Sequence, residues 1–337
     1  MIKKHFELVD FLKGYSIFTI VIYHFLLLYN LPYLLEKAIN FGGAGVHVFI
    51  LCSGFGLYLS HLYRPLKYWT FIKRRFFKIY IPYILVIFIS VLVPFIYIEN
   101  DKFLALLSSV FLYKMFDEHF INSFGGQLWF ISMIIQFYLV FPLLTKWIDS
   151  SKVVSHIIIT LLISLGWATL VGILGKTDLR VWNSFFLQYL WEFVLGMELA
   201  KYYFKNQNVE LPSRFFLIII SIIGIVLVGY TGIKGGIYKL YNDVPSLFGY
   251  LSLSLLIYSF SIKQINSFFL YTNKFAYEWY LIHILVFSCT FHFLSNYFQP
   301  VLTGLIGLFL SYILAIGYHR LLKYILFVKE PLAPSES

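Results

Sequence analysis

The chain has 337 residues, of which 60% are hydrophobic, 21% aromatic and only 12% charged, and its mean hydropathy is +0.80. Soluble domains carry about 25% charged residues, so this composition excludes a soluble protein and predicts an all-α protein that crosses a membrane repeatedly. The net charge of +10 does not indicate nucleic-acid binding, because membrane proteins gather lysine and arginine in their cytoplasmic loops. We therefore expect contact with membrane lipid and no nucleic-acid partner.

Ten apolar runs approach the length of about 20 residues that a helix needs to cross a bilayer. They lie at residues 8–30, 41–63, 76–98, 127–148, 153–175, 182–204, 214–232, 244–262, 277–297 and 301–322. A further apolar stretch, Phe103 to Phe116, is too short to cross and is followed by Asp117, Glu118 and His119. We expect this stretch to be a re-entrant or interfacial segment.

The distribution of positive charge predicts the orientation of these spans. With the N-terminus inside, most of the 26 lysines and arginines fall on the cytoplasmic side, which predicts ten spans with both termini cytoplasmic. The first run is too long for a signal peptide and lacks a small-residue cleavage site, so we expect it to remain in the mature protein. The expected organisation is one transmembrane domain at residues 1–329 and a short cytoplasmic tail at 330–337, in a cell membrane.

The first span, DFLKGYSIFTIVIYHF, carries three polar residues. Lys13 and His24 are eleven residues apart, which places them within about 20° of one helix face and about 16 Å apart along the axis. Asp10 is three residues before Lys13, close enough to pair with it, although both could simply lie at the membrane surface. His24 is deeper, and a histidine at such depth is a candidate general base, since its usual pKa of about 6.5 suits proton transfer near neutral pH.

A second polar cluster lies at the start of the third span, in YWTFIKRRFFKIYIPY. Its cations are Lys73, Arg74, Arg75 and Lys78. They could serve only as a topology signal, or they could bind a phosphorylated cytoplasmic ligand. Arg75 and Lys78 are three residues apart and share a helix face.

Other spans hold isolated polar residues. Glycines of the second span favour close helix packing, Ser53 is a candidate for a hydrogen bond, and the role of His47 stays open. Glu192 and Glu198 lie in the sixth span, and His283 in the ninth raises the same question as His24. The sequence contains no P-loop, dinucleotide fingerprint, HExxH or GxSxG motif.

Five stretches, in this order, resemble the acyltransferase 3 family of bacterial membrane enzymes that acylate cell-surface glycans. They are D-x-x-[RK]-G-x9-H from Asp10 to His24, GVHVFILCSGF, RRFFKIY, LWFISMIIQFYLVFPLL with Trp129 and Gln136, and YEWYLIH with His283. The resemblance implies that His24 is the catalytic histidine, that Lys13 is its basic partner, and that Arg75 and Lys78 handle acyl-CoA. The chain departs from the family at Lys78 and His47, and by lacking a glutamate after the tryptophan motif.

The expected activity is transfer of an acetyl or other short acyl group from cytoplasmic acyl-CoA, as acetyl-CoA or succinyl-CoA, to a hydroxyl of an extracytoplasmic or lipid-linked glycan. His24 would act as general base or as transient acyl carrier, and these alternatives stay open. We expect no tightly bound cofactor and no metal, and acceptor contact in the outer segment from Glu99 to Gly126. The alternative is a transporter or flippase of a lipid-linked glycan, with His24, Glu192 and His283 as proton relays or substrate contacts.

Overall fold

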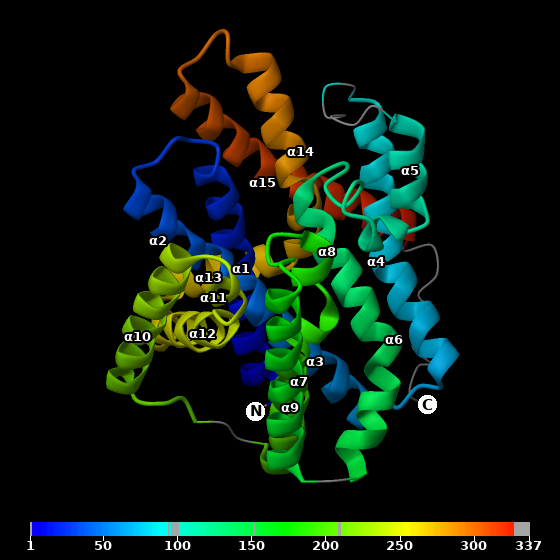
Figure 1. The fold of residues 1–337 in the computed structure, drawn as a ribbon, viewed down its shortest axis with the longest axis vertical. Helices are drawn as coiled ribbons and strands as arrows, with labels where there is room; N and C mark the ends of the chain where they lie inside the picture. The colour runs from blue at the N-terminus through cyan, green and yellow to red at the C-terminus, as the bar shows by residue number, and fades with distance from the viewer. Residues whose placement is uncertain (1, 94, 96–100, 151, 208–209, 327–337) are drawn as a thin grey trace, which may run out of the picture.

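The computed structural model describes residues 2–93, 95, 101–150, 152–207 and 210–326, and within them the chain forms helices and loops without a strand (Figure 1). The predicted all-α class is therefore confirmed. The predicted tail at 330–337 lies outside the described residues.

Each of the ten apolar runs overlaps a helix of at least 17 residues. These helices are α1 (Ile2–Leu26), α3 (Gly45–Tyr63), α4 (Tyr68–Val91), α6 (Trp129–Ser150), α7 (Val153–Ile173), α9 (Leu190–Asn206), α10 (Arg214–Lys234), α12 (Asp243–Ser259), α14 (Ala276–Leu294) and α15 (Pro300–Leu326). Helices satisfy every backbone hydrogen bond internally, which apolar surroundings require. The run at 182–204 is an exception in its first part, which holds α8 (Arg180–Asn183) and the 3-10 helix η4 (Phe186–Tyr189) before α9 begins.

Short elements connect the long helices. They are α2 (Tyr33–Gly43), α5 (Lys102–Val110), the 3-10 helices η2 (Tyr113–Phe116) and η3 (Gly126–Leu128), α11 (Ile237–Leu240) and α13 (Lys263–Asn273). The stretch expected to be re-entrant forms α5 and η2. The nine residues of α5 rise about 14 Å, less than half of the bilayer core.

Six helical segments of the described residues are long and apolar enough to cross a membrane. They are Glu7–Leu26, Tyr33–Tyr63, Gly126–Asp149, Val153–Ile173, Arg214–Lys234 and Pro300–Ile325. Many large apolar side chains of α7 and α10 are exposed, among them Leu162, Phe215 and Val226. Such outer faces are typical of helices in contact with lipid. The full count of ten crossings and the orientation of the termini stay predictions.

Close helix packing depends on glycines, as predicted from the glycines of the second span. A Cβ atom at Gly54 of α3 would collide with the Phe193 carbonyl of α9, and one at Gly196 of α9 would collide with the Leu51 carbonyl of α3. A side chain at Gly14 of α1 would likewise collide with the Phe269 carbonyl of α13. Small residues let backbones approach at these crossings, so α1 is held between α3 and α13.

Helices α14 and α15 pack on each other and hold α4 at its proline (Figure 1). Pro82 has no N–H to donate to the carbonyl four residues earlier, which weakens α4 at this point. Tyr277 of α14 donates a hydrogen bond to the Ile79 carbonyl at 2.8 Å, and Tyr318 of α15 donates one to the Pro82 carbonyl at 2.6 Å. These two tyrosines fix the distance between α4 and the pair α14 and α15.

Candidate active site

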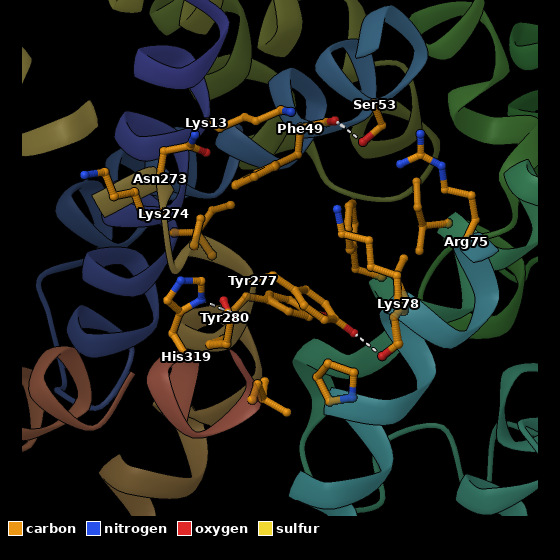
Figure 2. A pocket seen from close by; sticks show the side chains of 18 of the residues that line it. Lys13, Phe49, Ser53, Arg75, Lys78, Asn273, Lys274, Tyr277, Tyr280 and His319 are labelled. Atoms are coloured by element: carbon orange, nitrogen blue, oxygen red, sulfur yellow. Dashed lines mark hydrogen bonds and ion pairs between the residues drawn. The ribbon is translucent and has the colours of Figure 1, made fainter. Parts of the chain in front are cut away.

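A cavity of about 500 Å³ opens between α1, α3, α4, α6, α14 and α15 (Figure 2). Lys13 and Lys78 point toward it from α1 and α4, and Arg75 lies beside Lys78. Lys274, between α13 and α14, and Lys323 of α15 complete its positive charges. Three cations that the sequence analysis selected in two separate spans thus line one cavity, which we call the cationic cavity.

Glu278 is the one carboxylate among the described residues that line the cationic cavity. Its Oε1 atom accepts a hydrogen bond from Nδ1 of His319 at 2.9 Å. Five lysine or arginine side chains against one glutamate make the cavity strongly positive. Such a surface favours a ligand with several phosphate charges.

The remaining wall of the cavity is apolar and aromatic. Ile20, Phe49, Pro82, Phe130 and Tyr280 contribute to it. Tyr280 also donates a short hydrogen bond to the Gln127 carbonyl, which connects α14 to η3. The cavity therefore combines a cationic part with an apolar part, as a ligand with a phosphorylated head and a long uncharged arm requires.

His24 and His283 meet next to this apolar wall, although 259 positions separate them in the sequence. Nε2 of His283 lies 3.0 Å from Nδ1 of His24, and the two rings stack at a centroid distance of 5.0 Å. Ile20 lines the cavity one helical turn before His24, and Tyr280 lies 6.3 Å from the ring of His283. The histidine pair thus lies beyond the apolar end of the cavity.

The hydrogen bonds of this pair define which ring nitrogens carry protons. Nδ1 of His283 is 3.0 Å from the Trp279 carbonyl, which can only accept, so Nδ1 donates. In a neutral ring, Nε2 of His283 is then an acceptor and receives the N–H of His24 Nδ1. Nε2 of His24 is left with a free lone pair, the state that a general base or a nucleophile needs.

Asp10 and Lys13 make different contacts in the structure. Asp10 accepts a hydrogen bond from Nδ2 of Asn273 at 2.9 Å, and Lys13 lines the cavity. Asp10 and Lys13 form no close ion pair with each other, although they interact electrostatically. The carboxylate therefore binds α1 to the end of α13, while the ammonium group is available to a ligand.

Most of the other predicted site residues do not line the cavity. The exposed residues Lys73 and Arg74 do not line it. Trp129 stacks on Tyr189, and Oε1 of Gln136 accepts a hydrogen bond from the Phe186 amide at 3.3 Å. Ser53 does line the cavity, but its hydroxyl donates to the Phe49 carbonyl at 2.7 Å within α3.

The segment predicted to contact the acceptor supports a neighbouring loop. The two carboxylate oxygens of Glu118 accept hydrogen bonds from the amides of Arg180 and Val181, at 2.8 and 2.9 Å. Arg180 lies over the ring of Trp129 and interacts electrostatically with His24. Glu99, the first residue of this segment, lies outside the described residues.

A separate buried polar cluster joins α3, α9 and α12. Nδ1 of His47 donates to Oε1 of Glu192 at 2.7 Å, and its Nε2 lies 3.9 Å from Asp243, which accepts from Gln188 at 2.6 Å. Glu198 pairs instead with His156 of α7. None of these side chains lines the cationic cavity, and within the described residues no group of three His, Cys, Asp or Glu is arranged to hold a metal ion.

Four of the charged residues and histidines that line the cavity were not predicted from the sequence. They are Lys274, Lys323, Glu278 and His319. Their positions at span ends on the expected cytoplasmic side, where Arg75 and Lys78 also lie, were the only available signal.

The comparison with protein families gives a match over nearly the whole chain. The model of the acyltransferase domain, acyltransferase 3, matches residues 6–320. Searches of curated proteins and of solved structures found no match. The match includes His24, His283 and four of the five cations of the cavity, all except Lys323, so the chain belongs to the acyltransferase 3 family of membrane acyltransferases.

Proposed function

We propose that this acyltransferase moves a short acyl group from cytoplasmic acyl-CoA to a hydroxyl of an extracytoplasmic or lipid-linked glycan. The observation that carries the proposal is the cationic cavity, together with the pair of His24 and His283 next to its apolar wall, close to Tyr280. Phosphate groups of CoA would bind the cations, and the pantetheine arm would follow the apolar wall toward the histidine pair.

The proposed geometry fits the spacing along α1. Lys13 and His24 are about 16 Å apart along the helix axis, a distance of the order of an extended pantetheine arm. A diphosphate bound near Lys13 and Lys78 would therefore bring the thioester close to Nε2 of His24. Helix α1 thus contributes a phosphate ligand at one end and the catalytic histidine near the other.

In the direct mechanism, Nε2 of His24 takes the proton of the acceptor hydroxyl while the oxygen attacks the thioester carbonyl. The C–S bond breaks, and the departing thiolate of CoA receives the proton from His24. In the alternative, Nε2 itself attacks the thioester carbonyl, the C–S bond breaks and CoA departs as its thiolate. The acceptor hydroxyl then displaces the acyl group from Nε2, and its proton passes to the thiolate. Both routes need the free lone pair that His283 leaves on His24.

The proposed topology is that of a multi-pass protein of a bacterial cell membrane, with ten crossings and both termini cytoplasmic. The cytoplasmic excess of lysine and arginine supports this orientation. It places the ends of α1, α4, α14 and α15 that bear the cavity cations on the cytoplasmic side. His24, near the end of α1, then lies in the outer half of the membrane, nearer the acceptor.

The test is acyl transfer by purified protein in lipid vesicles, with labelled acetyl-CoA or succinyl-CoA and a cell-envelope glycan extract. The variants are His24→Ala and, as a matched control, His292→Ala, which removes an exposed histidine of α14. We expect labelled glycan with wild type and His292→Ala and none with His24→Ala. Equal transfer by His24→Ala would exclude His24 as the catalyst, and glycan movement without CoA turnover would indicate transport.

A further inference from the structure

Two cations of the cavity lie on a different wall from those that the sequence pattern selected. Arg75 and Lys78 belong to α4, whereas Lys323 belongs to α15 and Lys274 immediately precedes α14. Tyr277 and Tyr318 hold the two walls at a fixed separation through the carbonyls of α4. A ligand in the cavity therefore meets positive charge from two sides.

From this arrangement we infer that Lys274 and Lys323 bind the 3'-phosphate of CoA, and so select CoA over thioesters that lack this group. The inference rests on the proposed function, in which acyl-CoA is the donor. It adds two binding residues and a specificity that the α4 cations do not explain.

The charge of the cavity matches a donor with two phosphate centres. Five cations and Glu278 leave a net charge of about four positive units. The diphosphate of CoA carries two negative charges, and a phosphomonoester such as the 3'-phosphate carries about 1.5 to 2. A phosphopantetheine thioester on a carrier protein has a single phosphodiester charge, which would leave most of the cations unpaired.

The order of groups along the cavity assigns the two phosphate centres to different cations. When the thioester reaches His24, the diphosphate lies about 16 Å away, at the level of Lys13. The ribose 3'-phosphate follows the diphosphate and lies nearer the open end. Lys323 is one helical turn nearer the end of α15 than His319. Lys274 lies before the first turn of α14. Both lysines are exposed.

Both lysines are available to an anion. Glu278 is engaged by His319 at 2.9 Å. In the described part of the chain neither Lys274 nor Lys323 forms an ion pair, and Nζ of Lys274 lies 5.4 Å from the ring of Tyr271. A phosphate that binds there displaces no internal ion pair, and a charge-assisted contact of this kind contributes measurably to affinity.

The test is the dissociation constant of CoA and of 3'-dephospho-CoA for the full chain in lipid nanodiscs, by calorimetry. Binding of free CoA does not depend on the identity of the acyl group. The main variant is the double substitution Lys274→Gln with Lys323→Gln. Arg75→Gln tests the opposite wall, and Arg320→Gln is the control, since Arg320 is an exposed cation of α15 that does not line the cavity.

We expect wild type and Arg320→Gln to bind CoA about tenfold more tightly than 3'-dephospho-CoA. For the double variant, the dissociation constants of the two compounds should agree within about twofold. Both should equal that of 3'-dephospho-CoA for wild type. Arg75→Gln should weaken both compounds and keep the preference. A tenfold preference that survives in the double variant would overturn the inference and leave the proposed donor intact, whereas wild type that binds neither compound would contradict the donor itself.

Discussion

At the scale of single residues, the proposed chemistry depends on the contact between His24 and His283. The Trp279 carbonyl fixes the proton on Nδ1 of His283, and His283 in turn orients the N–H of His24. The depth of each histidine in an apolar span made it a candidate functional residue. Their contact was not predictable, because it depends on how α1 and α14 pack.

Substitution of His283 should separate orientation of the catalytic base from substrate binding. His283→Leu removes the acceptor for the His24 N–H, and we expect kcat to fall about 100-fold with little change in the KM for acyl-CoA. His283→Gln keeps an acceptor oxygen at a similar reach and should restore most of kcat. The measurement is steady-state acyl transfer for both variants.

A purely structural role for His283 predicts another pattern. In that case Leu and Gln would have similar effects on kcat, and both would lower the melting temperature. That result would show that the bond to His24 does not orient the base.

Neighbouring cations of α4 should have unequal effects on donor binding. Arg75 lines the cavity, whereas Arg74 is exposed and does not. We expect Arg75→Gln to raise the KM for acyl-CoA about tenfold, as the loss of a charge-assisted contact would. Arg74→Gln should change it by less than about threefold, as for a surface charge.

Equal KM values for these two arginine variants would show that the cluster acts only through its overall charge. From the sequence, only the shared helix face and the family resemblance distinguish Arg75 and Lys78 from Lys73 and Arg74. The rotation of α4 in the bundle decides which cations line the cavity, and Lys73 and Arg74 are exposed and do not line it.

At the scale of elements, α13 is one of the short helices that the apolar runs did not predict. It has only 11 residues and pairs with α1. Gly14 allows the two backbones to approach at Phe269, and the bond from Asn273 to Asp10 fixes the end of α13. The glycine and the aspartate of the D-x-x-[RK]-G pattern therefore position α1, while its lysine faces the cavity.

A methyl group at position 14 should disturb this packing. Gly14→Ala introduces a Cβ against the Phe269 carbonyl, and we expect a loss of about 1–3 kcal/mol in stability. Gly56→Ala of α3 is the matched control, because no atom lies within 4 Å of its Cβ position. Alanine there should be neutral or slightly stabilising, by up to about 1 kcal/mol.

Melting temperatures in detergent compare the two glycine variants. A Gly14→Ala protein as stable as Gly56→Ala would contradict the assigned contact between α1 and α13. Lower acyl transfer by Gly14→Ala is also expected, since α1 carries both Lys13 and His24.

The long helices were predictable where apolar residues continue for 17 or more positions. The start of α9 was not, because α8 and η4 occupy the first part of this run, and Glu118, 62 positions away from Arg180 in the sequence, accepts hydrogen bonds at the start of α8. Prediction from local hydropathy cannot include such contacts. The weak point of α4 follows from Pro82 alone, but the tyrosines that bond the Ile79 and Pro82 carbonyls beside it come from two other helices.

At the scale of the whole molecule, the proposed function requires the bundle to keep the two substrates apart. The cations gather at one end of the cavity, and the histidine pair lies beyond its other end. In the proposed orientation, donor and acceptor approach from opposite sides of the membrane and meet at His24. Composition predicted the bundle, while the cavity required the packing of six helices.

The most direct measurement of this claim uses sealed vesicles in which the protein has one orientation. Labelled acetyl-CoA is added to the side of the cavity cations, and the cell-envelope glycan extract is enclosed on the other side. We predict labelled glycan inside the vesicles with wild type and none with His24→Ala. Label only on glycan placed on the same side as the donor, or transfer that persists in His24→Ala, would contradict the account.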